Sequence, residues 1–143
     1  MTYLSKIYKK DLYKFKYDIR ITNVEEIINF LDTELNIKEE IQEVLYCICL
    51  NSKNNIINIF ENTIGTSNYN ITSSKDIMKK VLLSNADRLI LVHNHPSGDS
   101  TPSDQDNIFT KQINKACKIL DVKLLDHIIV GKKYFSYYEN EIL

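Results

Sequence analysis

Two of the chain's three histidines stand one residue apart, in the stretch LILVHNHPSGDSTPSDQD that runs from Leu89 to Asp106. His93 and His95 directly follow an apolar run that is typical of a buried strand. Residues i and i+2 of an extended chain point to the same side, so both imidazoles are directed at one point. This arrangement suits zinc, which favours nitrogen ligands and in catalytic sites combines three protein ligands with one open position.

A third ligand is expected nearby, and Asp106 is the best local candidate. Ser103 can act as the N-cap of a helix that begins at Asp104, which places Asp106 near the third helical residue, beside the loop. The alternative is a purely structural turn, because H-x-H by itself is a weak signal. The ligand set that zinc requires favours a metal site over that alternative.

Hydrophobic periodicity predicts the elements that position this stretch. Apolar residues at helical spacing predict helices over 23–35, 75–85 and 104–120, and apolar runs predict strands over 41–51, 56–65, 86–93, 122–131 and 133–139. The short polar segment between the first two strands predicts a hairpin. Helices recur between strands along the chain, so we expect an α/β fold with one mixed sheet flanked by helices.

The length of 143 residues predicts one folded domain over 23–143, preceded by a basic, tyrosine-rich arm over residues 1–22. The arm contains Lys6, Lys9, Lys10, Lys14, Lys16 and Arg20, interleaved with Tyr3, Tyr8, Tyr13 and Tyr17. Such a mixture could contact phosphates and stack on bases. The formal net charge of −1 instead favours a solvated arm, or one that packs on the domain or on a second copy. Nucleic-acid binding is therefore the weaker expectation, and the oligomeric state stays open.

We expect a cytoplasmic protein without a membrane segment. No apolar run approaches the ~18 residues of a membrane span, and the N-terminus has no apolar signal-peptide region. The three cysteines, an odd number, predict reduced thiols. Cys47 and Cys49 could pair on a metal, but the apolar run VLYCICL favours core packing, which we also expect for Cys117.

The stretch HNHPSGDSTPSDQD, with DHIIVG downstream, closely resembles the RadC family of bacterial proteins, part of the MPN/JAMM metallopeptidase-like superfamily. The superfamily pattern is a glutamate, then H-x-H, then S-x-x-D, and the resemblance extends from QEVLYCICLN at 42–51 to YFSYYENEIL at 134–143. It implies a fold similar to that of cytidine deaminases, with zinc ligands at His93, His95 and Asp106. Longer members carry an N-terminal helix-hairpin-helix-like region. Residues 1–40 show no such motif, so we expect a short form.

The residues alone do not decide the upstream glutamate. Glu43 begins an otherwise apolar strand, an unusual place for a carboxylate without a partner. If that strand lies antiparallel to the histidine strand, its start meets the histidines, but Glu61 falls near the same end of the predicted hairpin. The resemblance selects Glu43. His127, a lone histidine in a predicted strand, is expected to be structural and hydrogen-bonded.

The resemblance implies a zinc-dependent hydrolase that uses a metal-activated water to cleave an amide or isopeptide bond in a peptide or protein. Glu43 would transfer the proton, and Ser103 would donate a hydrogen bond to the developing oxyanion. The alternative is a non-catalytic RadC-like binding module with DNA or protein partners. A nuclease is weaker still, because the sequence shows one metal site and not a carboxylate-rich pair.

Overall fold

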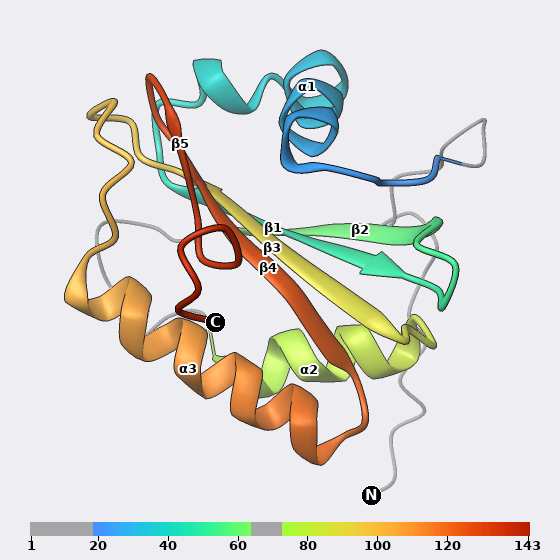
Figure 1. Cartoon of the computed structure of the whole chain (residues 1–143). Coiled ribbons are helices and arrows are strands. Elements are labelled where there is room, and N and C mark those ends of the chain that lie inside the picture. Colours follow the sequence, from blue (N-terminus) through green and yellow to red (C-terminus); the bar gives the residue numbers. More distant parts are fainter. Residues whose placement is uncertain (1–18, 64–72) are drawn as a thin grey trace, which may run out of the picture.

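The computed structural model describes residues 19–63 and 73–143. Over these ranges the chain forms α-helices, strands and one short 3-10 helix, arranged as shown in Figure 1. The elements are α1 (Val24–Leu35), η2 (Ile37–Glu39), β1 (Val44–Leu50), β2 (Ile56–Thr63), α2 (Ser74–Leu83), β3 (Arg88–Asn94), α3 (Asp104–Ile119), β4 (Lys123–Val130) and β5 (Tyr134–Ser136). The predicted α/β class and the predicted order of helices and strands are confirmed, with η2 as an addition.

The strands form one mixed sheet in the order β2-β1-β3-β4-β5. β1 pairs antiparallel with both β2 and β3, which confirms the predicted hairpin and meets the condition under which the first strand starts near the histidines. β3 pairs parallel with β4, and β4 pairs antiparallel with β5. A parallel pair needs a crossover connection, and α3 supplies it between β3 and β4. The loop that leads into α3 therefore leaves the sheet from its central strand.

Helices cover both faces of the sheet, α1 on one side and α2 with α3 on the other (Figure 1). Alternate residues of β1 divide between the two cores: Leu45, Cys47 and Cys49 pack with α2 and α3, while Tyr46, Ile48 and Leu50 pack toward α1. Every residue of β1 is buried, which explains why its sequence is continuously apolar. Cys47, Cys49 and Cys117 are free and buried, as their apolar context predicted.

Residues 1–18, most of the predicted arm, lie outside the described residues. The part of the arm that follows is attached to the domain, because Arg20 forms a β-bridge with Asn55 and Ile21 is buried against the α1 side of the core. The boundary at residues 22 and 23 stays a prediction. Within 19–63 and 73–143, no helix has the length and apolar character needed to cross a membrane.

Candidate metal centre

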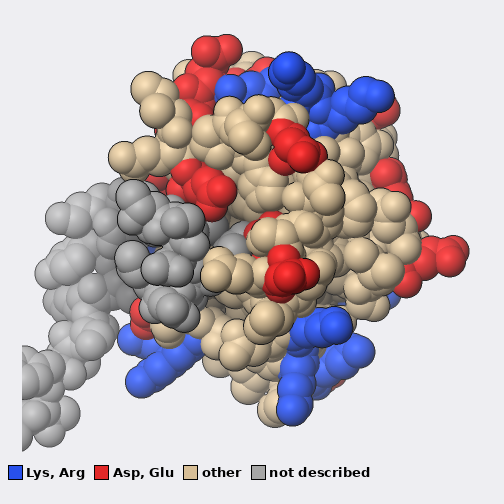
Figure 2. Space-filling model, turned by 90° about the vertical axis from the view of Figure 1, so that its left-hand side faces the viewer, with Lys and Arg blue, Asp and Glu red and all other residues tan. Residues whose placement is uncertain are grey.

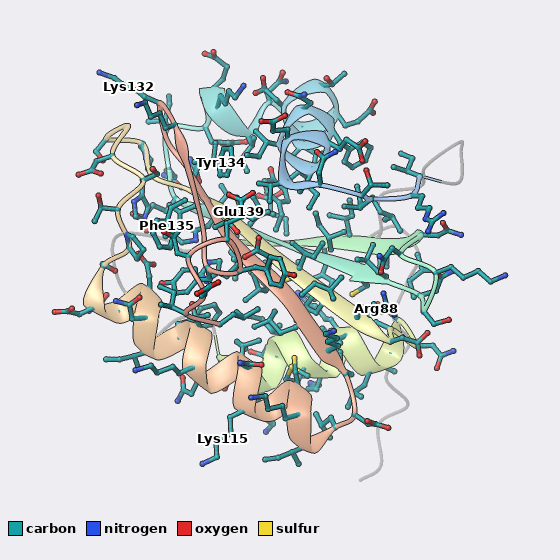
Figure 3. All side chains as sticks on the ribbon, in the orientation of Figure 1. Arg88, Lys115, Lys132, Tyr134, Phe135 and Glu139 are labelled. Carbon is teal, nitrogen blue, oxygen red and sulfur yellow. The ribbon has the colours of Figure 1, made fainter. Side chains whose placement is uncertain are left out.

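The two histidines lie at the C-terminal end of β3, on the face covered by α2 and α3. His93 is opposite Leu45 of β1, and cross-strand partners share a face. His93 is fully buried, while His95, just beyond the strand, is partly exposed. Figure 3 labels Arg88 at the start of β3 and Lys132 in the turn after β4, so the histidines lie at the Lys132 end of the sheet.

The first turn of α3 brings Asp106 to the histidines. Ser103 is the N-cap, as predicted: its hydroxyl accepts the N–H of Asp106 at 3.0 Å. In return, Oδ2 of Asp106 accepts the N–H of Ser103 at 2.7 Å, which completes a capping box. These two bonds fix the orientation of a carboxylate that is only 1% exposed.

The ligand atoms of His93, His95 and Asp106 all lie within 4.8 Å of one another, so the three residues could hold a metal ion. The two Nε2 atoms are 3.0 Å apart, and they lie 3.2 Å and 3.3 Å from the carboxylate oxygens of Asp106. Ligands about 2.0–2.1 Å from a tetrahedral zinc ion are themselves about 3.3–3.4 Å apart. The spacing and the two-nitrogen, one-oxygen donor set therefore fit zinc with three protein ligands.

His95 presents its Nε2 atom because its other ring nitrogen is already engaged. Nδ1 lies 2.7 Å from the carbonyl oxygen of Asp99, and a carbonyl can only accept, so Nδ1 carries the proton. The hydrogen bond with Asp106 raises the pKa of His95, and the negative charge of Glu43 adds a smaller contribution. In acid the ring of His95 carries a second proton, on Nε2, and a metal ion must displace that proton, so metal binding weakens as the pH falls.

His127 supports His93 through a chain of hydrogen bonds that returns to Asp106. The hydroxyl of Thr110 donates to the carbonyl oxygen of Asp106 at 2.6 Å, so it must accept from Nδ1 of His127, also 2.6 Å away. Burial lowers the pKa of His127 well below its usual value, so the ring is neutral and its Nε2 accepts from Nδ1 of His93 at 2.8 Å. The chain fixes His93 in the tautomer whose Nε2 lone pair is directed at the candidate metal position.

The sequence predicted a hydrogen-bonded histidine at 127 but not that its partner would be a candidate ligand. The ring of Tyr137 stacks on it, with centroids 5.1 Å apart and an interplanar angle of 6°, and the hydroxyl of Tyr137 donates to Asn107 at 2.7 Å. Thr110 and Tyr137 were missed by sequence reasoning, since their contacts with His127 depend on how α3 and the segment after β5 pack against β4.

Gly131, the last residue of DHIIVG, is where the turn after β4 meets the histidine loop. A Cβ atom there would lie 2.4 Å from the carbonyl oxygen of Gly98 and 3.1 Å from the N atom of Ser100. The two segments are joined by hydrogen bonds from Lys132 N–H to Gly98 and from His95 N–H to Val130, both 2.8 Å. Glycine at 131 therefore permits the close approach that holds the loop in place.

The strand register separates the two candidate glutamates. Glu43 stands two residues before Leu45, which pairs with His93, so the alternation of an extended chain directs its side chain to the face of the ligands, and its charge acts on His95. Glu43 is half-buried there. Glu61 pairs with Tyr46, whose side chain packs toward α1, so Glu61 leaves the sheet on the other face.

The chain is similar along most of its length to proteins of one family. A sequence profile for the RadC-like JAB domain matches residues 21–142. A UPF0758 protein of Thermotoga maritima is 38% identical over 124 residues, covering 81% of this chain and 56% of that protein. Another from Chlorobium phaeovibrioides is 33% identical over 144 residues, covering 100% and 64%. A third, from Caldanaerobacter subterraneus, is 42% identical over 111 residues, covering 78% and 47%.

The chain spans about half to two thirds of the length of these curated relatives. The matched region contains β1, the H-x-H pair, the S-x-x-D capping box and the DHIIVG strand, which together build the candidate metal centre. The chain therefore belongs to the RadC family, and its residues 21–142 form a RadC-like JAB domain.

Proposed function

We propose that the protein is a zinc-dependent hydrolase that cleaves an amide or isopeptide bond. The observation that supports the proposal is a carboxylate outside the ligand set: the negative charge of Glu43 acts on His95, and the alternation of the strand directs its side chain to the ligand face. His93, His95 and Asp106 would hold a zinc ion, which would supply an activated water and polarise the substrate carbonyl. Three ligands suffice to hold it and leave a coordination position for chemistry.

Glu43 and Ser103 take the two remaining roles. Glu43 accepts the proton of the attacking water and returns it to the leaving nitrogen, which is general base and then general acid catalysis. The hydroxyl oxygen of Ser103 accepts the N–H of Asp106, which leaves the hydroxyl proton for a bond to the developing oxyanion. Ser103 is exposed at the start of α3, where a substrate carbonyl has access to it.

The charge around the loop favours a peptide or protein substrate over a nucleic acid. In Figure 2, which views this side of the molecule, Lys and Arg lie toward the upper and lower edges, with mostly uncharged and some acidic residues between them. Asp99 within the loop and Asp104 at the start of α3 are both exposed. A phosphodiester backbone requires a basic surface. The free, buried cysteines agree with a cytoplasmic setting, where thiols stay reduced.

Glu43→Gln tests the function because it keeps the size of the side chain and removes the base. The zinc-loaded parent is assayed against a panel of peptides and isopeptide-linked conjugates. The variant should retain the parent's zinc content and lose ~10²-fold or more of the rate. Ser103→Ala should lose a similar factor, since one oxyanion donor contributes ~3 kcal/mol. Glu61→Gln, on the opposite face, should match the parent.

Asp106→Ala should release zinc while the protein stays folded, which separates metal binding from folding. Loss of zinc in Glu43→Gln would make Glu43 a ligand, and an unchanged rate would exclude it as the base. If the zinc-loaded parent cleaves no member of the panel, a non-catalytic binding module replaces the hydrolase.

A further inference from the structure

Asn94, the residue between the two histidines, points to the opposite side of β3 from theirs and is 3% exposed. Its side chain makes three hydrogen bonds to the backbone of the segment that leads into β1. Oδ1 accepts the N–H of Val44 at 2.8 Å, and Nδ2 donates to the carbonyls of Gln42 at 3.0 Å and Glu40 at 3.3 Å. The side-chain amide of Asn94, at the end of β3, thus holds three backbone groups of the segment that leads into β1.

Glu43 lies inside the segment that Asn94 holds. The ladder between β1 and β3 ends at the pair Leu45–His93, and the ladder between β1 and β2 ends at Val44–Thr63, so strand pairing stops one residue short of Glu43. Burial of side chains does not fix the segment before β1 either, because Ile41 is 90% exposed and Gln42 is also exposed. The hydrogen bonds of Asn94 are therefore the main constraint that this part of the structure provides on the backbone of Glu43.

We propose that Asn94 is a positioning residue that holds Glu43 beside the metal ligands. The inference rests on the proposed role of Glu43. Within the H-x-H sequence, it assigns metal binding to His93 and His95 and the positioning of the base to Asn94. The role needs an amide, because it requires one acceptor and two donated N–H groups in the same side chain. Alanine loses all three bonds, and aspartate keeps the acceptor but cannot donate.

The test uses the cobalt-loaded protein, because Co²⁺ takes the same nitrogen and oxygen ligands and absorbs visible light. The pH titration of its visible bands reports on ionisable groups next to the metal and needs no substrate. Glu43→Gln should move the midpoint downward by ~1 unit, because it removes a nearby negative charge. Asn94→Ala should move it in the same direction by at least half as much. The double variant should move it no further than Glu43→Gln alone, as expected for residues that act as one unit.

Asn58→Ala is the matched control. Asn58 is another buried asparagine, 5% exposed, that bonds Ser84 on the far edge of the sheet, and its loss should leave the titration unchanged. Amide exchange at Val44 should accelerate in Asn94→Ala and stay at the parent rate in Asn58→Ala. Because Asn94 lies on the other face, cobalt affinity should change less than threefold in Asn94→Ala. If that variant does not fold, Asn94→Asp replaces it.

A parent-like titration in Asn94→Ala, with a shifted one in Glu43→Gln, would overturn the role of Asn94 and leave the proposed function standing. Additive shifts in the double variant would also overturn it, because Asn94 would then act independently of Glu43. An unshifted titration in Glu43→Gln would instead place Glu43 away from the metal and contradict the proposed function itself.

Discussion

Thr110→Val removes one hydroxyl from the hydrogen-bond chain that joins two candidate ligands. The side chain keeps its size and its branching at Cβ, and Thr110 is buried, so the new methyl group occupies the space of the hydroxyl. Two bonds of 2.6 Å are lost, one to the carbonyl oxygen of Asp106 and one to Nδ1 of His127. The Asp106 carbonyl lies within α3 and keeps its helical hydrogen bond, so the main effect falls on His127.

The size of the effect follows from what His127 loses. Its Nδ1–H becomes a buried donor without a partner, which costs about 1–3 kcal/mol of unfolding free energy. If the proton moves to Nε2 to relieve this cost, His127 can no longer accept from His93, 2.8 Å away. The tautomer of His93 is then no longer fixed, and zinc affinity should fall about 10–100-fold.

Urea unfolding of the metal-free protein and zinc competition against a chromophoric chelator measure the two effects separately. Thr33→Val, an exposed position on α1, makes the same chemical change far from the site and should alter neither quantity. Parent-like zinc affinity in a folded Thr110→Val protein would refute the role of the chain in fixing His93. A fall in stability alone would assign the hydroxyl to the fold and not to the metal centre.

Two further predictions concern the same region. Gly131→Ala should lower the unfolding free energy by about 1–3 kcal/mol and weaken zinc binding, since its Cβ would meet the backbone of Gly98. Lys133 is exposed in the same turn, so Lys133→Ala is the control for both the unfolding free energy and the zinc affinity. Burial lowers the pKa of His127, so below ~6.5 the unfolded chain takes up a proton that the native ring does not, and metal-free protein should lose stability as the pH falls. The raised pKa of His95 opposes this trend, so the unfolding free energy is measured in a His95→Gln background. In that background, a stability that does not change between about pH 5 and 7 would contradict a buried, neutral His127 ring.

Local patterns predicted most of the elements because both faces of the sheet are covered. β1 and β3 are buried on both sides, and their continuous apolar runs are the signal from which both strands were predicted. The last strand was predicted over 133–139, but β5 ends at Ser136. Asp126 accepts hydrogen bonds from the hydroxyl of Ser136 and the N–H of Tyr138, which turns the chain away from the sheet. The local sequence does not indicate such a contact with β4, so the end of β5 could not be predicted from it.

The candidate ligands could be predicted because they belong to one short stretch with a recognisable cap. The surrounding residues could not, because their roles depend on register and on contacts between elements. Topology alone left Glu43 and Glu61 open, and only the resemblance selected Glu43; the structure directs the two side chains to opposite faces of the sheet. The role inferred for Asn94 depends on hydrogen bonds to the segment before β1, which the local sequence does not indicate.

The register between β1 and β3 divides the centre into two parts that evolution can alter independently. The candidate ligands all lie between residues 93 and 106, in β3 and the start of α3, and none belongs to β1. Glu43 reaches them only because β1 is aligned with β3 as it is, and a slip by one residue would send it to the α1 face. A single-codon insertion between Glu43 and Val44 would leave the register of β1 and β3 in place and turn the proposed base away from the ligand face. A duplicated copy of this domain could lose the proposed hydrolysis in one such step and persist as a metal-dependent binding protein.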